Sequence, residues 1–161
     1  MKRLALLILA TAALAGPATA QNAGQIARVR GGASCPGCNL FQADLMGLER
    51  GGLNFARARL RQATLTAAVM NRANFAGADL RDVDASAATF SSASFAGANL
   101  TNANFVGSYL QGANFRGATL TGAVFSGAEM DRAVGLTQGQ LNGACGDDST
   151  RLPRGLRIPR C

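Results

Sequence analysis

Two cysteines separated by only two residues, in the Cys-Pro-Gly-Cys segment of residues 35–38, have the spacing for redox chemistry. Such a pair is the redox centre of thioredoxin-like proteins, in which a thiolate attacks a disulfide. A redox centre is one interpretation and a structural disulfide is the other. The absence of a surrounding βαβ pattern favours the structural disulfide. Two further cysteines, Cys145 and Cys161, lie near the end of the chain.

Three carboxylates form a second group with chemical potential, at Asp79, Asp82 and Asp84. Clustered carboxylates perform acid–base catalysis in polysaccharide-cleaving enzymes and bind Ca²⁺ in other proteins. Acid–base catalysis also needs a cleft, which short turns do not supply. The chain has no histidine, which excludes imidazole-dependent mechanisms and His-ligated zinc or haem. We expect no cofactor.

Arginines form a third group, because Arg57, Arg59 and Arg61 alternate along one segment and Arg81 follows. Guanidinium groups bind carboxylates and phosphates, so these four residues are a candidate surface for an anionic polymer or lipid headgroups. The other interpretation is a solvated face whose ion pairs contribute little free energy. We do not expect nucleic-acid binding, because no aromatic residues are interleaved with the arginines.

The first twenty residues have the three parts of a secretory signal peptide. Lys2 and Arg3 precede a short apolar run, and the small residues Ala18-Thr19-Ala20 follow it. The run is shorter than the ~20 residues that a membrane-spanning helix needs, and no later segment is continuously apolar. Cleavage after residue 20 would lower the formal net charge from +7 to +5, because it removes one Lys and one Arg. We therefore expect a periplasmic or secreted protein without an integral membrane segment.

The residues that must position these groups follow a strict period of five from Cys38 to Arg132. The central position of each pentapeptide is a multiple of five and is large and apolar in seventeen of nineteen repeats; Arg50 and Ala85 are the exceptions. The position two residues earlier is Ala in fourteen repeats. An α-helix has a period of 3.6 and a strand a period of 2.0, so neither would keep these residues on one face.

The sequence resembles the pentapeptide-repeat family, whose pattern is Ala, then Asp or Asn, then Leu or Phe, then two variable residues. Residues 78–80, 98–100, 103–105 and 113–115 all match this pattern. The resemblance implies an all-β fold, a right-handed quadrilateral β-helix of about five coils, with four pentapeptides per coil and the central residues inside. Positions twenty apart would then stack as columns. The predicted core ladder comprises Leu40, Leu60, Leu80, Leu100, Leu120, Phe55, Phe75, Phe95 and Phe115.

The two exceptions and the corners also lead to expectations. At Arg50 we expect a distorted repeat or an outward side chain, and at Ala85 a smaller core lining that Val83 partly compensates. A ligand-binding notch at these positions is the alternative. Glycines at the last position of several repeats, such as Gly77 and Gly97, suggest corners that require a positive φ.

Both ends of such a solenoid need covers, because they would expose the core and unpaired strand edges. Thr137 and Gln140 have capping-box spacing and predict a short helix from about Gln138 to Ala144. Four cysteines in an exported protein most simply form two disulfides, and proximity favours Cys35–Cys38 and Cys145–Cys161. Cross-pairing would require the ends of a ~23 Å rod to meet.

The predicted organisation therefore has four parts. These are a signal peptide at 1–20, a flexible linker at 21–34, the repeat β-helix at 35–134, and a disulfide-closed cap at 135–161. We expect a non-catalytic exported scaffold that binds an unknown protein or anionic polymer through its outer face. The alternatives are a carboxylate-based polysaccharide-active or Ca²⁺-binding protein, and a Cys-X-X-Cys redox protein. Some cytoplasmic members of the family are acidic rods that mimic DNA, from which this chain differs in charge and in predicted compartment.

Overall fold

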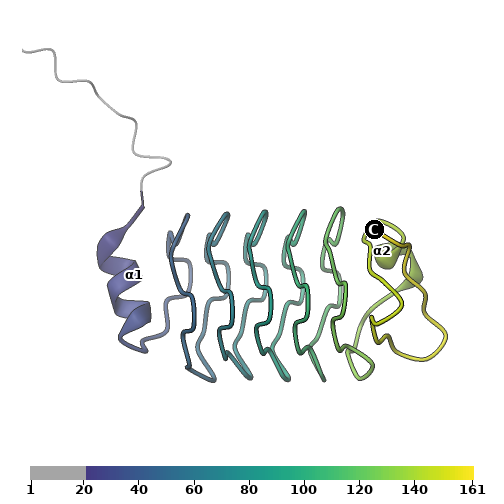
Figure 1. The fold of residues 1–161 in the computed structure, drawn as a ribbon. Coiled ribbons are helices and arrows are strands. Elements are labelled where there is room, and N and C mark those ends of the chain that lie inside the picture. The colour runs from purple at the N-terminus through teal and green to yellow at the C-terminus, as the bar shows by residue number, and fades with distance from the viewer. Residues whose placement is uncertain (1–20) are drawn as a thin grey trace, which may run out of the picture.

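The computed structural model describes residues 21–161, and Figure 1 shows them as a stack of coils with a helix at each end. Helix α1 spans Ala23–Arg30 and helix α2 spans Gln138–Leu141. Between them the chain winds as a right-handed quadrilateral β-helix, which confirms the predicted fold class. The predicted signal peptide lies outside the described residues. Within residues 21–161, neither helix has the length and apolar character needed to cross a membrane.

Parallel β-bridges join residues that are twenty apart, from Asn39 with Arg59 to Asn114 with Val134. The backbone N–H of Leu40 donates to the carbonyl of Arg59 at 2.8 Å, and the same contact recurs from coil to coil. Each side of a coil contributes a single bridged residue, because two of its five residues form the turn at the corner. The coil length of four pentapeptides is therefore confirmed.

Each corner is a β-turn closed by one backbone hydrogen bond. In the first coil the N–H of Ala43 donates to the carbonyl of Leu40 at 3.0 Å, while Gln42 has φ 52°. A positive φ at the third turn residue is the feature of a type II turn. The corner glycines have the predicted positive φ, including Gly77 at 64° and Gly97 at 65°.

The central and alanine positions fill the interior. All nine residues of the predicted core ladder are buried; they are Leu40, Leu60, Leu80, Leu100, Leu120, Phe55, Phe75, Phe95 and Phe115. The phenyl rings of the last four stack at centroid distances of 5.0, 5.2 and 5.3 Å. These spacings are close to the ~4.8 Å between neighbouring strands, so the backbone ladder and the ring column share one repeat.

The two exceptional centres behave differently. The Arg50 side chain is exposed and turns outward. Its backbone N–H still donates to the carbonyl of Val69 at 2.9 Å, so the backbone ladder continues through this repeat. Ala85 and Val83 are both buried, and the hydroxyl of Ser108 donates to the carbonyl of Ala85 at 2.7 Å. Because Ala85 has no exposed surface, it does not line an open notch.

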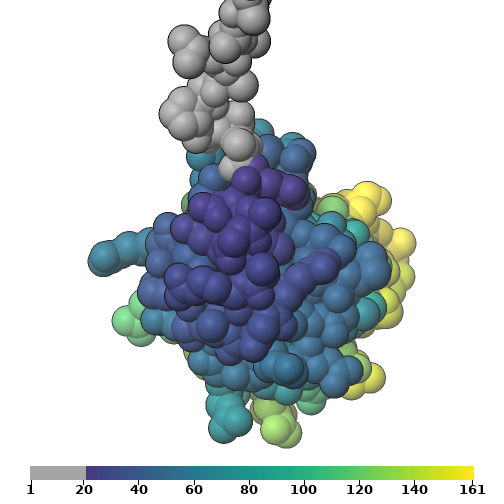
Figure 2. Space-filling model, turned by 90° about the vertical axis from the view of Figure 1, so that its left-hand side faces the viewer, coloured from purple at the N-terminus to yellow at the C-terminus, as the bar shows by residue number. Residues whose placement is uncertain are grey.

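The prediction of a flexible linker at 21–34 is wrong, because α1 occupies most of that segment. The side chain of Asn22 caps the helix by accepting from the N–H of Gln25. Val29 is fully buried against the core, and Oε1 of Gln25 accepts from the N–H of Asn39 at 2.7 Å. Figure 2 shows this segment covering the middle of the N-terminal end of the rod. Helix α1 therefore closes both the core and the backbone edge of the first coil.

At the other end, α2 has the predicted capping box between Thr137 and Gln140 but ends at Leu141 rather than near Ala144. Asn142 caps its C-terminus, and a tight turn follows, in which the N–H of Ala144 donates to the carbonyl of Leu141. Leu141 is fully buried and plugs the last coil. The ladder continues into the predicted cap, since Val124 bridges Cys145 and Glu129 bridges Arg151.

Candidate interaction surface

Three positions of each repeat point outward, because the central residue and the preceding alanine point inward. The residue between these two is often Asp or Asn, and its carboxyl or amide oxygen accepts a hydrogen bond from the backbone two residues later. Seven residues make this contact at 2.9–3.1 Å to the next turn: Asp44, Asn54, Asn74, Asp84, Asn99, Asn104 and Asn114. These side chains fix the corners, which explains why the sequence places Asp or Asn there.

The three predicted carboxylates, Asp79, Asp82 and Asp84, all accept hydrogen bonds from neighbouring groups. Asp79 accepts from the guanidinium of Arg81 at 2.7 and 2.8 Å, and this hydrogen bonding lowers the pKa of the Asp79 carboxyl. Burial opposes ionisation of Asp84, but hydrogen bonds that include the N–H of Ser86 and the amide of Asn104 lower its pKa overall. A general acid needs a raised pKa, so both shifts run against that role.

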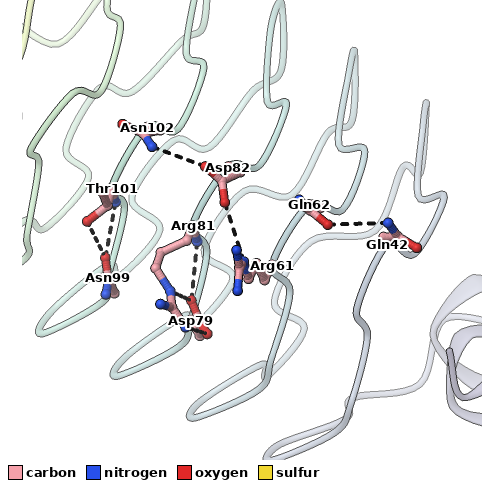
Figure 3. A network of polar contacts seen from close by, with 9 residues as sticks. All are labelled: Gln42, Arg61, Gln62, Asp79, Arg81, Asp82, Asn99, Thr101 and Asn102. Carbon is pink, nitrogen blue, oxygen red and sulfur yellow. Dashed lines mark hydrogen bonds and ion pairs between the residues drawn. The ribbon is translucent and has the colours of Figure 1, made fainter. Parts of the chain in front are cut away.

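Asp82 completes a polar network across three coils, which Figure 3 shows from close by. It accepts from Arg61 at 3.4 Å and from the amide of Asn102 at 3.2 Å. Within residues 21–161, no three carboxylates or cysteines come together as a group that could hold a metal ion. Asp79, Asp82 and Asp84 therefore have separate hydrogen-bond partners on the surface.

The four arginines of the candidate surface divide into two pairs. Arg61 and Arg81 each have a carboxylate partner, Asp82 and Asp79 respectively, and their charge is partly neutralised. Arg59 and Asp79, which lie one coil apart, are bridged through their backbones. The Asp79 carboxylate nevertheless turns to Arg81 on its own coil (Figure 3).

Arg57 and Arg59 lie two residues apart on the second coil, and only Arg57 borders a hollow of the surface. The guanidinium of Arg59 lies 5.8 Å from the centroid of the Phe41 ring, a cation–π contact with the coil before it. Arg57 is an exposed corner residue with φ 58°. It borders an open pocket of about 430 Å³, which we call the arginine groove and which is lined by Pro36, Gly37, Ala56, Arg57 and Ala76.

The Cys35–Cys38 pair forms a disulfide that closes the first corner of the solenoid. Cys35 occupies a central position and Cys38 an alanine position, and the N–H of Cys38 makes the corner hydrogen bond to the carbonyl of Cys35. Cys35 has no exposed surface and Cys38 is 7% exposed. Thiol–disulfide exchange requires access to a sulfur, so this burial favours a structural disulfide over a redox centre.

Cys145 and Cys161 form the second disulfide, which fastens the end of the chain to the last coil. The N–H of Cys161 also donates to the carbonyl of Gly146 at 3.0 Å. Both disulfides therefore lie at the ends of the rod, in the pairing that proximity in the sequence favours.

Two features of this surface were missed from the sequence. The contact of Arg59 with Phe41 joins positions eighteen apart, and only the twenty-residue coil length indicates that such residues are neighbours. The arginine groove arises because small residues occupy the same corner in successive coils, at Pro36, Ala56 and Ala76. Reading the outward columns as well as the inward ones would have found both.

The sequence matches the family described as pentapeptide repeats, in eight copies that cover residues 54–91, 98–134 and 108–145. A search of curated proteins gave no match. Similar solved structures include a pentapeptide repeat protein, Rfr23, from the cyanobacterium Cyanothece 51142. It has 22% sequence identity and a TM-score of 0.44, and the match covers 80% of this chain and 97% of that chain.

Two further solved structures are similar to this one. A pentapeptide repeat protein from the Arabidopsis thaliana thylakoid lumen, AT2G44920, has 26% identity and a TM-score of 0.31, with 65% of this chain and 66% of that chain covered. QnrB1, described as a plasmid-mediated fluoroquinolone resistance protein, has 18% identity and a TM-score of 0.37, with 75% and 79% covered.

Proposed function

Because the chain belongs to the pentapeptide-repeat family, we propose that it is a non-catalytic scaffold that works outside the cytoplasm and binds another macromolecule through its outer face. The single observation that carries the proposal is the division of the solenoid into a filled interior and a polar exterior. Every repeat centre from Phe55 to Met130 is buried, so the chemistry available to a partner lies on the outward positions.

The outward carboxylates support a non-catalytic role. Asp79 and Asp84 fix turns and have lowered pKa values, and Asp82 is bonded to Arg61 and Asn102. None of these groups has the environment that keeps a carboxyl protonated near neutral pH. The exposed Arg57 and the arginine groove beside it are better suited to binding than to bond cleavage.

Export is supported by the sequence of residues 1–20 and by the two disulfides. Disulfides persist in oxidising compartments, whereas cytosolic thiols are kept reduced. All four cysteines of the chain are paired. The protein therefore works as a disulfide-bonded rod in the periplasm or in the surroundings of the cell.

Fractionation of cells that express the full chain tests the export. We expect a disulfide-bonded protein whose N-terminal residue is Gln21, recovered outside the cytoplasm. A Leu7→Arg variant, which interrupts the apolar run, should remain in the cytoplasm with free thiols. A wild-type chain that keeps Met1 and stays in the cytoplasm would contradict the proposal.

Binding through the outer face is tested by affinity capture from an extracytoplasmic extract. The triple variant Arg57→Ala, Arg59→Ala and Arg61→Ala should retain less of the bound material than the wild type. A second triple variant removes the same charge from exposed positions elsewhere, at Arg116, Arg132 and Arg154. Equal retention by the wild type and both variants would place the binding surface elsewhere.

A further inference from the structure

We propose that the arginine groove, together with Arg59, binds an acidic polysaccharide, a chain of sugars that carry carboxylates. The inference rests on the proposed scaffold function and names the partner of its outer face. Four observations carry it: the distribution of charge along the rod, the availability of the Arg57 guanidinium, the shape of the groove floor, and the state of the backbone groups around it.

Charge is unevenly distributed along the described chain. Residues 21–72 contain seven Arg and two acidic residues, whereas residues 73–150 contain three Arg and seven acidic residues. Residues 151–161 add four Arg and no acid. At physiological ionic strength charges act over only about 8 Å, so a polyanion is attracted to the first two coils and repelled by the middle of the rod.

Arg57 provides a guanidinium that the rest of the chain leaves available. Among residues 21–161 no hydrogen bond or ion pair holds its side chain, and the residue is exposed at a corner. Arg59 lies over Phe41, which presents the guanidinium plane in a defined orientation. Guanidinium groups bind carboxylates with two parallel hydrogen bonds, so these two residues suit a polymer with repeated carboxylates.

Small, mostly apolar residues form the floor beside Arg57. Pro36, Ala56 and Ala76 line it, and a side chain added at Gly37 would meet no atom within 4 Å, so the space there is open. A small, flat apolar floor accommodates the C–H face of a sugar ring. The Arg57 guanidinium beside the floor would meanwhile bind the carboxylate of that ring, and Arg59, farther along the same coil, would bind the carboxylate of the next ring.

The backbone around the groove argues against an extended peptide as the partner. The N–H groups of Gly37, Arg57 and Gly77 already donate to carbonyls of the next coil, at 2.9 Å in each case. A peptide that adds a strand needs free N–H and C=O groups along an edge, and this corner offers none from these residues. An acidic polysaccharide binds through its carboxylates, so it does not need free backbone N–H and C=O groups.

The test measures binding of the purified, disulfide-bonded protein to polygalacturonate, with methyl-esterified polygalacturonate as the neutral control. We expect binding to the acidic form alone, and we expect it to weaken as salt is added. Arg57→Ala should weaken binding at least tenfold, and Arg57→Ala with Arg59→Ala should abolish it. Ala76→Glu, which puts a negative charge in the groove, should also abolish binding.

The matched control is Arg116→Ala, which removes an exposed arginine from the same corner three coils away. It should change the affinity less than twofold, and all variants should keep the circular dichroism of the wild type. Several results would overturn the inference: no binding to polygalacturonate, equal loss in Arg116→Ala, or tighter binding to polyglutamate or anionic phospholipid vesicles. An exported protein that binds none of these probes would leave the scaffold proposal standing and remove this one.

Discussion

At the scale of single residues, the turn position with a positive φ recurs at most corners of the solenoid. Glycine occupies many of these positions, but nine non-glycine residues also have φ between 52° and 59°. A left-handed conformation costs an L-residue about 1–2 kcal/mol, so these corners are a reservoir of local strain. The rest of the coil overcomes this cost through burial and the backbone ladder.

A matched pair of substitutions measures that strain. Gly97→Ala introduces a side chain at φ 65° with no neighbouring atom within 4 Å, so only the backbone conformation opposes it. We expect the free energy of unfolding to fall by about 1 kcal/mol. Ala67→Gly, at φ 56°, should raise it by less than about 1 kcal/mol, because glycine also gains entropy in the unfolded chain. Denaturant unfolding of both variants checks the signs, and changes of the same sign would refute the explanation.

We expect Asp147 to make the free energy of unfolding depend on pH. Hydrogen bonds from the Ser149 hydroxyl, at 2.6 Å, and from the N–H of Gly127, at 3.0 Å, lower the pKa of its carboxyl from 3.8 to about 2. Because the folded pKa lies below the unfolded one, the stabilisation is present above about pH 4 and is lost as the pH falls to about 2.

Asp147→Asn keeps an acceptor oxygen but cannot titrate, so it separates the two effects. We expect its unfolding midpoint to change less between pH 5 and pH 2 than that of the wild type. Thermal unfolding at a series of pH values provides the measurement, and Asp131→Asn controls for the removal of one acidic group. A variant that follows the wild-type curve would assign the acid sensitivity to other carboxyls.

At the scale of elements, the two caps close the rod by different means. Helix α1 contributes the buried Val29, whereas α2 contributes the buried Leu141 and the side chain of Gln140. The Gln140 amide donates to the carbonyls of Phe115 and Ala118, at 2.9 and 2.8 Å. Those carbonyls belong to the last full coil, and the Gln140 amide supplies N–H donors at this edge of the ladder.

Gln140→Glu replaces that amide with an acceptor that cannot donate to the two carbonyls. We expect a loss of about 1–3 kcal/mol in the free energy of unfolding, since the Ala118 carbonyl loses its partner while the Phe115 carbonyl keeps the corner hydrogen bond from the N–H of Ala118. Gln62→Ala is the control, because Gln62 bonds only the exposed side chain of Gln42, at 3.2 Å. Equal stability of the Gln140 variant and the wild type would show that the edge is closed without this side chain.

The period of five predicted which residues are buried, because it admits few ways to bury one residue in five. The core columns followed from the coil length that the resemblance to the family implies. The sequence also predicted the capping box of α2, since Thr137 and Gln140 form a local signal. Helix α1 was missed because its periodic signal is weak. The helix has eight residues, and only two of its apolar side chains, Ile26 and Val29, are buried or half-buried. Docking on the first coil, rather than helix propensity, stabilises it.

Side-chain pairing on the outer face could not be predicted from the repeat, for a related reason. The twenty-residue coil determines which residues are neighbours, but each long side chain can reach several of these neighbours. Asp79 is bonded to Arg81 on its own coil instead of Arg59 on the previous one, and Arg61 reaches Asp82. Such choices depend on rotamers and on neighbouring turns, which the repeat pattern does not specify.

At the scale of the whole molecule, the rod is a stack of equivalent coils that contact only their neighbours. Deleting residues 81–100 removes one complete coil and keeps every later residue on its own face. Deleting residues 81–95 removes only three of the four sides of a coil, so every later residue moves to a neighbouring face. Phe75 then no longer stacks on another phenylalanine of its column.

We therefore expect the twenty-residue deletion to unfold cooperatively and at a higher temperature than the fifteen-residue deletion. Thermal unfolding followed by circular dichroism compares them. Higher stability of the fifteen-residue deletion would contradict the role of the columns.

We propose that the protein acts through one outer surface of a filled rod, the arginine groove. Nuclear magnetic resonance of the ¹⁵N-labelled protein, titrated with short galacturonate oligomers, tests it most directly. The account predicts chemical-shift changes confined to the amides around Gly37, Ala56, Arg57, Arg59 and Ala76, and none in the last coil. Changes centred on Asp79, Asp82 and Asp84 or on the C-terminal arginines, or no changes at all, would contradict it.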